Sequence, residues 1–147
     1  YEEAVREAIE VKLAEPDLTV DTHGWDLAAK VAIMASILTG ENVTINDIHR
    51  KPLEEVPAEE VAKGPKQGYR IRYLGVANLE KRRYYVGPEK LPLSSLLASL
   101  TGMFSGAEFI VEGERMIVIG PAGPAWRTAK VMVTDTIEYL RLLELNK

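Results

Sequence analysis

The sequence contains no cysteine, and this absence excludes several kinds of site. Without thiols the chain has no disulfide framework, no thiolate metal site and no cysteine nucleophile. Long apolar runs are also missing, because the longest, residues 31–38, falls far short of the roughly 18–20 residues that a membrane span requires. An excess of basic residues is absent too, since 18 lysines and arginines stand against 22 aspartates and glutamates. The resulting net charge of −4 provides no field that attracts nucleic acid or an anionic membrane.

What the chain does contain is typical of one globular domain. Its 147 residues are 46% hydrophobic and 27% charged, which is an ordinary composition for a folded protein of this length. The N-terminus is acidic and amphipathic, unlike a secretory signal or a transit peptide. It also begins at Tyr1, without methionine and inside a helical pattern. We therefore expect a trimmed chain or a fragment of a larger protein.

The hydrophobic pattern predicts helices at both ends of the chain and strands between them. Helices are expected over residues 2–14, from a cap at Asp21 or Thr22 to about residue 39, and over residues 58–62 and 125–145, with a further short helix within 93–100. A polar connection is expected between the first two helices. Two hairpins are expected, one from residues 69–77 and 82–87 and one from residues 107–111 and 116–120. The pattern indicates one α+β domain over residues 1–147, with a largely antiparallel or mixed sheet built from hairpins and covered by helices.

Lys30 is the only charged residue between Leu27 and Thr39, and Asp26 precedes it by one helical turn. The simplest interpretation is a surface ion pair worth roughly 0.2–0.5 kcal/mol, with the lysine stem reaching to water. However, apolar residues occupy most faces of this predicted helix, which indicates that the helix is buried. A buried lysine is costly unless another group holds its charge. We therefore expect a functional role for the pair.

Two further carboxylates, Glu15 and Asp21, lie just before this pair. Such a set can bind the ammonium group of an amino acid and present Lys30 to a carbonyl oxygen, as a proton donor or an electrostatic stabiliser. Asp21 also has a plainer interpretation, because Asp21 and Thr22 are residue types that cap the start of a helix. Neither histidine of the chain has the spacing of a metal ligand, so we expect no metal site.

The segment from Glu15 to Lys30, EPDLTVDTHGWDLAAK, resembles the substrate-site signature of homoserine dehydrogenases, E-x-D-P-x-x-D-x-x-G-x-D-A-A-x-K. The spacing of the three carboxylates and the lysine fits that signature without gaps. A second block, residues 97–109 and 120–136, is similar to the last strands, the glycine-containing turn and the final helix of the same family. The resemblance spans nearly the whole chain.

The resemblance implies an oxidoreductase that interconverts L-aspartate 4-semialdehyde and L-homoserine with NAD or NADP, in the cytoplasm, on the route to threonine and methionine. By residue match, Lys30 and Asp26 are catalytic: Lys30 assists proton transfer at the reacting oxygen, and Asp26 orients both it and the substrate. The residues matched to binding roles are Glu15 and Asp21 for the substrate and Gly120, Gly123 and Thr128 for the cofactor. The resemblance also implies a homodimer, formed through the sheet.

The family's N-terminal dinucleotide-binding domain has no counterpart in this sequence, because no G-x-G-x-x-G motif follows a strand. We therefore expect the isolated chain to be inactive, with the cofactor bound mainly by a missing domain. An alternative from another class is a non-catalytic, dimeric amino-acid-binding or regulatory module that has kept the pocket. Leu13 and the turn around Pro124 depart from the family pattern and favour that alternative. A nucleotide-binding segment directly upstream of Tyr1 would exclude it.

Overall fold

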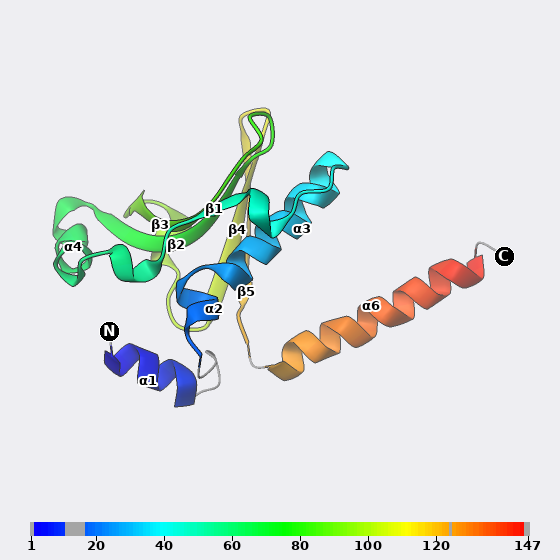
Figure 1. The fold of residues 1–147 in the computed structure, drawn as a ribbon, viewed down its shortest axis with the longest axis horizontal. Helices are drawn as coiled ribbons and strands as arrows, with labels where there is room; N and C mark the ends of the chain where they lie inside the picture. The colour runs from blue at the N-terminus through cyan, green and yellow to red at the C-terminus, as the bar shows by residue number, and fades with distance from the viewer. Residues whose placement is uncertain (1, 11–16, 124, 146–147) are drawn as a thin grey trace.

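The computed structural model describes residues 2–10, 17–123 and 125–145, which combine helices with two small sheets (Figure 1). The helices are α1 (Glu2–Glu10), α2 (Thr19–Thr22), α3 (Trp25–Thr39), α4 (Ala58–Lys63), α5 (Leu96–Ser99) and α6 (Ala125–Leu145). Single 3-10 turns are η1 (Ile45–Asp47), η2 (Leu53–Glu55) and η3 (Gly64–Gln67). The strands are β1 (Ile48–Arg50), β2 (Tyr69–Asn78), β3 (Arg83–Pro92), β4 (Phe104–Val111) and β5 (Glu114–Pro121). The predicted α+β class is confirmed.

The strands form two separate sheets, and each contains one of the predicted hairpins. In the first sheet the order is β1-β3-β2, with β2 antiparallel to β3 from Tyr69↔Pro92 to Asn78↔Arg83 and with β1 parallel to β3. The second sheet is the β4–β5 hairpin alone. Both hairpins are therefore confirmed, although β3 extends beyond its predicted end at residue 87. Strand β1 was not predicted, because three residues are too few to establish an alternating pattern.

The core lies between α3 and the three-stranded sheet. On the helix side it contains Ala28, Val31, Ala32 and Ala35, and on the sheet side it contains Ile48, Tyr84 and Val86. Small side chains let the two layers approach closely. At Gly75 of β2 there is no room for a side chain, because an added Cβ would overlap Val31 Cγ2 and lie 3.3 Å from Leu27 Cγ. This packing fixes α3, and the residues on its outer face, relative to the sheet.

The expectation of a polar connection up to a cap at Asp21 or Thr22, then one helix to about residue 39 that is buried on most faces, is wrong in two respects. The chain forms α2 and α3 instead, separated at His23 and Gly24, where Gly24 has a left-handed φ of +74°. Only the alanine-rich face of α3 is covered, whereas Ile33 is 60% exposed and Ile37 is 76% exposed. The apolar residues are present on several faces as predicted, but within the described part of the chain no element packs over the outer ones.

The terminal helices lie apart from this core. Helix α6 has the predicted bounds and extends away from both sheets in Figure 1. Its predicted apolar stripe, which includes Val133, Ile137 and Leu140, is exposed along its length. Helix α1 is described only as far as Glu10, so the remainder of the helix predicted over residues 2–14 lies outside the described residues. Within the described residues, no helix is both long and apolar enough to cross a membrane.

Candidate active site

Asp21 and Asp26 lie on opposite sides of the α2–α3 junction, the segment Thr22–Trp25 that connects the two helices. Gly24 makes this junction possible, because its φ of +74° is a conformation that glycine adopts at no steric cost. The junction also packs tightly on the sheet: a Cβ at Gly24 would lie 2.6 Å from both Tyr73 Oη and Val86 Cγ1. The two carboxylates are therefore carried by separate helices, and the connection between the helices is fixed by its packing on the sheet.

Helical structure begins at Thr19 of α2, before the cap predicted at Asp21 or Thr22. Asp21 and Thr22 do not cap a helix; both belong to α2. Leu18 occupies the N-cap position of α2, and Asp17 just before it binds the first residue of the helix, since its Oδ1 accepts hydrogen bonds from the backbone N–H of Thr19 at 3.0 Å and from the Thr19 hydroxyl at 2.7 Å. These two bonds stabilise the carboxylate and lower the pKa of Asp17 below its ordinary value. Asp21 is an exposed residue within α2.

Asp26 and Lys30 form an ion pair on the outer face of α3. Lys30 Nζ donates a hydrogen bond to Asp26 Oδ2 at 2.6 Å. The side chains are 62% exposed for Lys30 and 48% exposed for Asp26, so the expected dry pocket around the lysine is absent from the described chain. An ammonium group that is held by a carboxylate and open to solvent is accessible to a small polar molecule.

The remaining predicted site residues lie elsewhere. Glu15 and Pro124 are outside the described residues. Gly120 is near the end of β5, with open space where a Cβ would be, and Gly123 lies between β5 and α6 against the side chain of Arg127. Thr128 is exposed in the first turns of α6. No hydrogen bond or ion pair within the described part of the chain joins this segment to Asp26 or Lys30. The structure thus brings Asp26 and Lys30 together, but does not join them to the predicted cofactor residues.

Residues from the sheet side of the junction were missed by sequence reasoning. The guanidinium carbon of Arg50, on β1, lies 3.2 Å from the ring centroid of Trp25. The Thr22 side chain interacts with the Glu54 carboxyl of η2, and this interaction lowers the pKa of that carboxyl. No spacing rule connects such residues along the chain. They meet only because β1 pairs with β3 beside α3.

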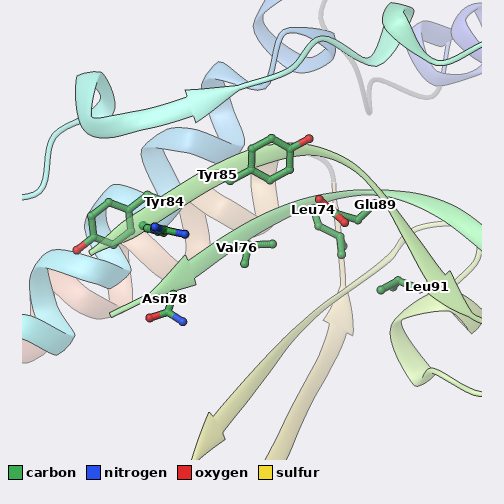
Figure 2. A pocket seen from close by; sticks show the side chains of 8 residues that line it. Leu74, Val76, Asn78, Tyr84, Tyr85, Glu89 and Leu91 are labelled. Atoms are coloured by element: carbon green, nitrogen blue, oxygen red, sulfur yellow. The ribbon is translucent and has the colours of Figure 1, made fainter. Parts of the chain in front are cut away.

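A hollow on the hairpin of β2 and β3 is lined by mainly apolar side chains, among them Leu74, Val76, Tyr85 and Leu91 (Figure 2). These positions alternate along the strands with Gly75 and Val86, which belong to the packing on the α3 side. The hollow is therefore on a different side of the sheet from the Asp26–Lys30 pair. Among the described residues, no group of three or more histidines, aspartates or glutamates is placed to hold a metal ion.

Comparisons with known proteins agree over nearly the whole chain. The family model described as homoserine dehydrogenase matches residues 1–137. The homoserine dehydrogenase of Methanocaldococcus jannaschii is 31% identical over 93% of this chain and 40% of its own length. That of Bacillus subtilis is 28% identical over 99% of this chain and 34% of its own length.

The fold agrees as well. The crystal structure of a homoserine dehydrogenase from Thiobacillus denitrificans superimposes with a TM-score of 0.85 at 25% identity, covering 96% of this chain and 33% of that one. The chain therefore spans between a third and two-fifths of the length of these relatives. A family match that runs from the first residue through most of α6, together with the shared fold of α3 and its sheet, places the chain in the homoserine dehydrogenase family.

Proposed function

We propose that this chain supplies the substrate-binding and catalytic residues of an NAD- or NADP-dependent homoserine dehydrogenase, which interconverts L-aspartate 4-semialdehyde and L-homoserine. The observation that supports this most directly is the Asp26–Lys30 pair, closed at 2.6 Å on an accessible helix face within a chain that matches the family. Acting in the cytoplasm, such an enzyme would serve the synthesis of threonine and methionine.

Lys30 is the proposed proton donor. Its ammonium group hydrogen bonds to the aldehyde oxygen, stabilises the negative charge that develops there during reduction, and transfers a proton to that oxygen. Asp26 keeps Lys30 in place, since its carboxylate already accepts a hydrogen bond from Nζ. In the opposite direction the same lysine takes the proton from the hydroxyl group of homoserine. Asp21, and Glu15 outside the described residues, are the proposed partners of the substrate's ammonium group.

The residues proposed for the cofactor are Gly120, Gly123 and Thr128. They fit that role locally, because the space beside Gly120 is open and Thr128 is exposed near the start of a helix of 21 residues, where backbone N–H groups favour a polar or anionic partner. Bound there, a nicotinamide cofactor supplies the hydride chemistry. These residues are too few to hold a whole dinucleotide, so most of its binding belongs to a nucleotide-binding domain outside residues 1–147.

Residues 1–147 form one proposed domain for substrate binding and dimerisation. The supporting observation for dimerisation is the hollow of Leu74, Val76, Tyr85 and Leu91, which lies on the face of the sheet opposite α3. A homodimer formed through this face would bury apolar surface that is costly to expose.

The test uses the chain completed with a nucleotide-binding segment, in cis or in trans. Oxidation of NADH or NADPH is followed by absorbance with aspartate semialdehyde as substrate. We expect turnover in the completed protein, no turnover in the isolated chain, and a fall of at least about a hundredfold in kcat for Lys30→Ala, because general acid catalysis is typically worth 10²–10⁴-fold.

The chain offers a matched control. Lys63 and Glu59 form an exposed ion pair with the same spacing on α4, away from the junction. Lys63→Ala should leave the rate unchanged. If Lys30→Ala and Asp26→Ala also retain the rate, the site assignment is wrong. If no combination is active but the chain binds homoserine, the chain is an amino-acid-binding module and not part of an enzyme.

A further inference from the structure

We propose that Arg50, Glu54 and Tyr73, here called the junction clamp, are positioning residues that set the angle between α2 and α3. This inference rests on the proposed function, because it assigns the clamp the task of aligning Asp21 with the Asp26–Lys30 pair. Each member of the clamp comes from the sheet side of the chain and contacts or approaches a different residue of the junction.

Arg50 holds the first residue of α3. Its guanidinium carbon lies 3.2 Å from the centroid of the Trp25 ring, at stacking distance. Arg50 Nε is buried and has no hydrogen-bond partner within the described residues, so the indole face is a favourable contact for a guanidinium that is not fully hydrogen-bonded. A planar guanidinium on an indole restricts the rotation of both groups, which lysine cannot reproduce. The pair therefore ties the residue directly before Asp26 to strand β1.

Glu54 and Tyr73 hold the other side of the junction. Thr22 is a buried polar residue at the end of α2, and its side chain interacts with the carboxyl of Glu54. Because Thr22 directly follows Asp21, its burial in this contact helps to fix the end of α2. Tyr73 lies under Gly24, where its hydroxyl donates to the backbone carbonyl of Lys51 at 3.0 Å and leaves no space for a Cβ.

These contacts matter for the site because Asp21 and Asp26 lie on different rigid elements. Asp26 and Lys30 share α3, so their mutual distance does not depend on the junction. Asp21 belongs to α2, so its position relative to that pair depends on how the junction sets the two helices. A substrate whose ammonium group binds on α2 and whose aldehyde reacts on α3 requires both helices at a fixed angle. Loss of the clamp should therefore weaken substrate binding more than it slows the chemical step.

The experiment measures kcat and KM for homoserine in the completed protein. Arg50→Lys keeps the positive charge but loses the planar contact with Trp25, and Thr22→Val removes the hydroxyl at nearly constant volume. We expect each to raise KM about fivefold, in proportion to a typical cation–π or hydrogen-bond contribution, with kcat changed less than twofold. Trp25→Phe retains an aromatic face and should raise KM less than Trp25→Leu. Arg115→Lys, in an exposed pair on β5, is the matched control.

A second measurement does not depend on activity. In a Trp126→Phe background Trp25 is the only tryptophan, and its fluorescence should change with Arg50→Lys but not with Arg115→Lys. If wild type is active and Arg50→Lys leaves both KM and the Trp25 emission unchanged, the clamp is refuted while the proposed function stands. If KM and kcat change together and in step with lost stability, the residue is merely structural and the inference is overturned. If the completed wild-type protein shows no activity with homoserine, the proposed function is overturned, and with it the positioning role.

Discussion

Replacing Gly75 with alanine provides a sensitive test of how closely α3 packs on the sheet. The new methyl group would overlap Val31 Cγ2 and lie 3.3 and 3.4 Å from Leu27 Cγ and Cδ1. Val31 is only 2% exposed and is surrounded by core residues, so it cannot turn into solvent. Overpacking of a filled core typically costs about 1–3 kcal/mol. We expect Gly75→Ala to lower the free energy of unfolding by an amount in that range.

A second substitution shows whether this cost arises at Val31. Val31→Ala alone should lower the free energy of unfolding by about 2 kcal/mol, from about 0.8 kcal/mol for each of the two carbons removed plus the cavity left behind. In the double variant the methyl group at Gly75 occupies part of the space that Val31 Cγ2 vacates. The two losses should therefore be less than additive, with a coupling of about 1 kcal/mol or more.

Urea denaturation followed by circular dichroism measures these values, provided that the slope with denaturant stays the same in all variants. Gly120→Ala is the control, because a Cβ at Gly120 meets no atom within 4 Å and should cause no loss of stability. If the losses from Gly75→Ala and Val31→Ala add within about 0.5 kcal/mol, the two positions do not compete for the same space and the described packing of α3 is wrong.

Three further predictions concern other parts of the chain. Arg72 Nη2 donates to the carbonyl of Ala98 at 2.6 Å, so Arg72→Met should lower the free energy of unfolding by about 1–2 kcal/mol in a urea titration. The backbone N–H and hydroxyl of Thr44 both donate to Asp47, which lowers the pKa of that carboxyl. Stability from this cap is present above the ordinary aspartate pKa of about 4 and is lost as the pH falls through the lowered value, so Asp47→Asn should flatten the pH dependence of unfolding in that acidic range. If the hollow that contains Leu74 and Val76 forms the dimer interface, Val76→Lys should shift the sedimentation of the protein toward that of a monomer. Unchanged sedimentation would refute that interface.

Local patterns in the sequence were sufficient to predict several elements and insufficient for others. The hairpin of β4 and β5 was predicted from strands that flank Glu112 and Gly113, and both residues have positive φ in the turn. Helix α6 was predicted with its observed bounds from a long helical pattern. The break between α2 and α3 at Gly24 was missed, because a glycine inside a helical pattern does not by itself predict a left-handed conformation. That conformation depends on the contact with Tyr73 and Val86, which are distant in the sequence.

The same distinction applies to the candidate site. The spacing of Asp26 and Lys30 predicted that their side chains would meet, and they do so within one helix. Burial of Lys30 was predicted from the apolar residues around it, and this was wrong for the described chain, because composition shows that a face is apolar but not what covers it. Arg50 was missed for a related reason, since its contact with Trp25 exists only once a three-residue strand has joined the sheet.

The packing of the domain and its proposed catalytic role are connected through α3. One face of the helix is built of alanines and Val31 and sits on a sheet that carries a glycine at the point of closest approach. The opposite face carries Asp26 and Lys30. Since a helix moves as a rigid rod, any change in its height above the sheet moves the carboxylate and the ammonium group together, and leaves their distance unchanged. It does change their relation to α2, whose position is set separately at Gly24. The placement of Asp26 and Lys30 therefore depends on uncharged residues of the core, and small side chains at those positions are as necessary to the proposed chemistry as the charges themselves.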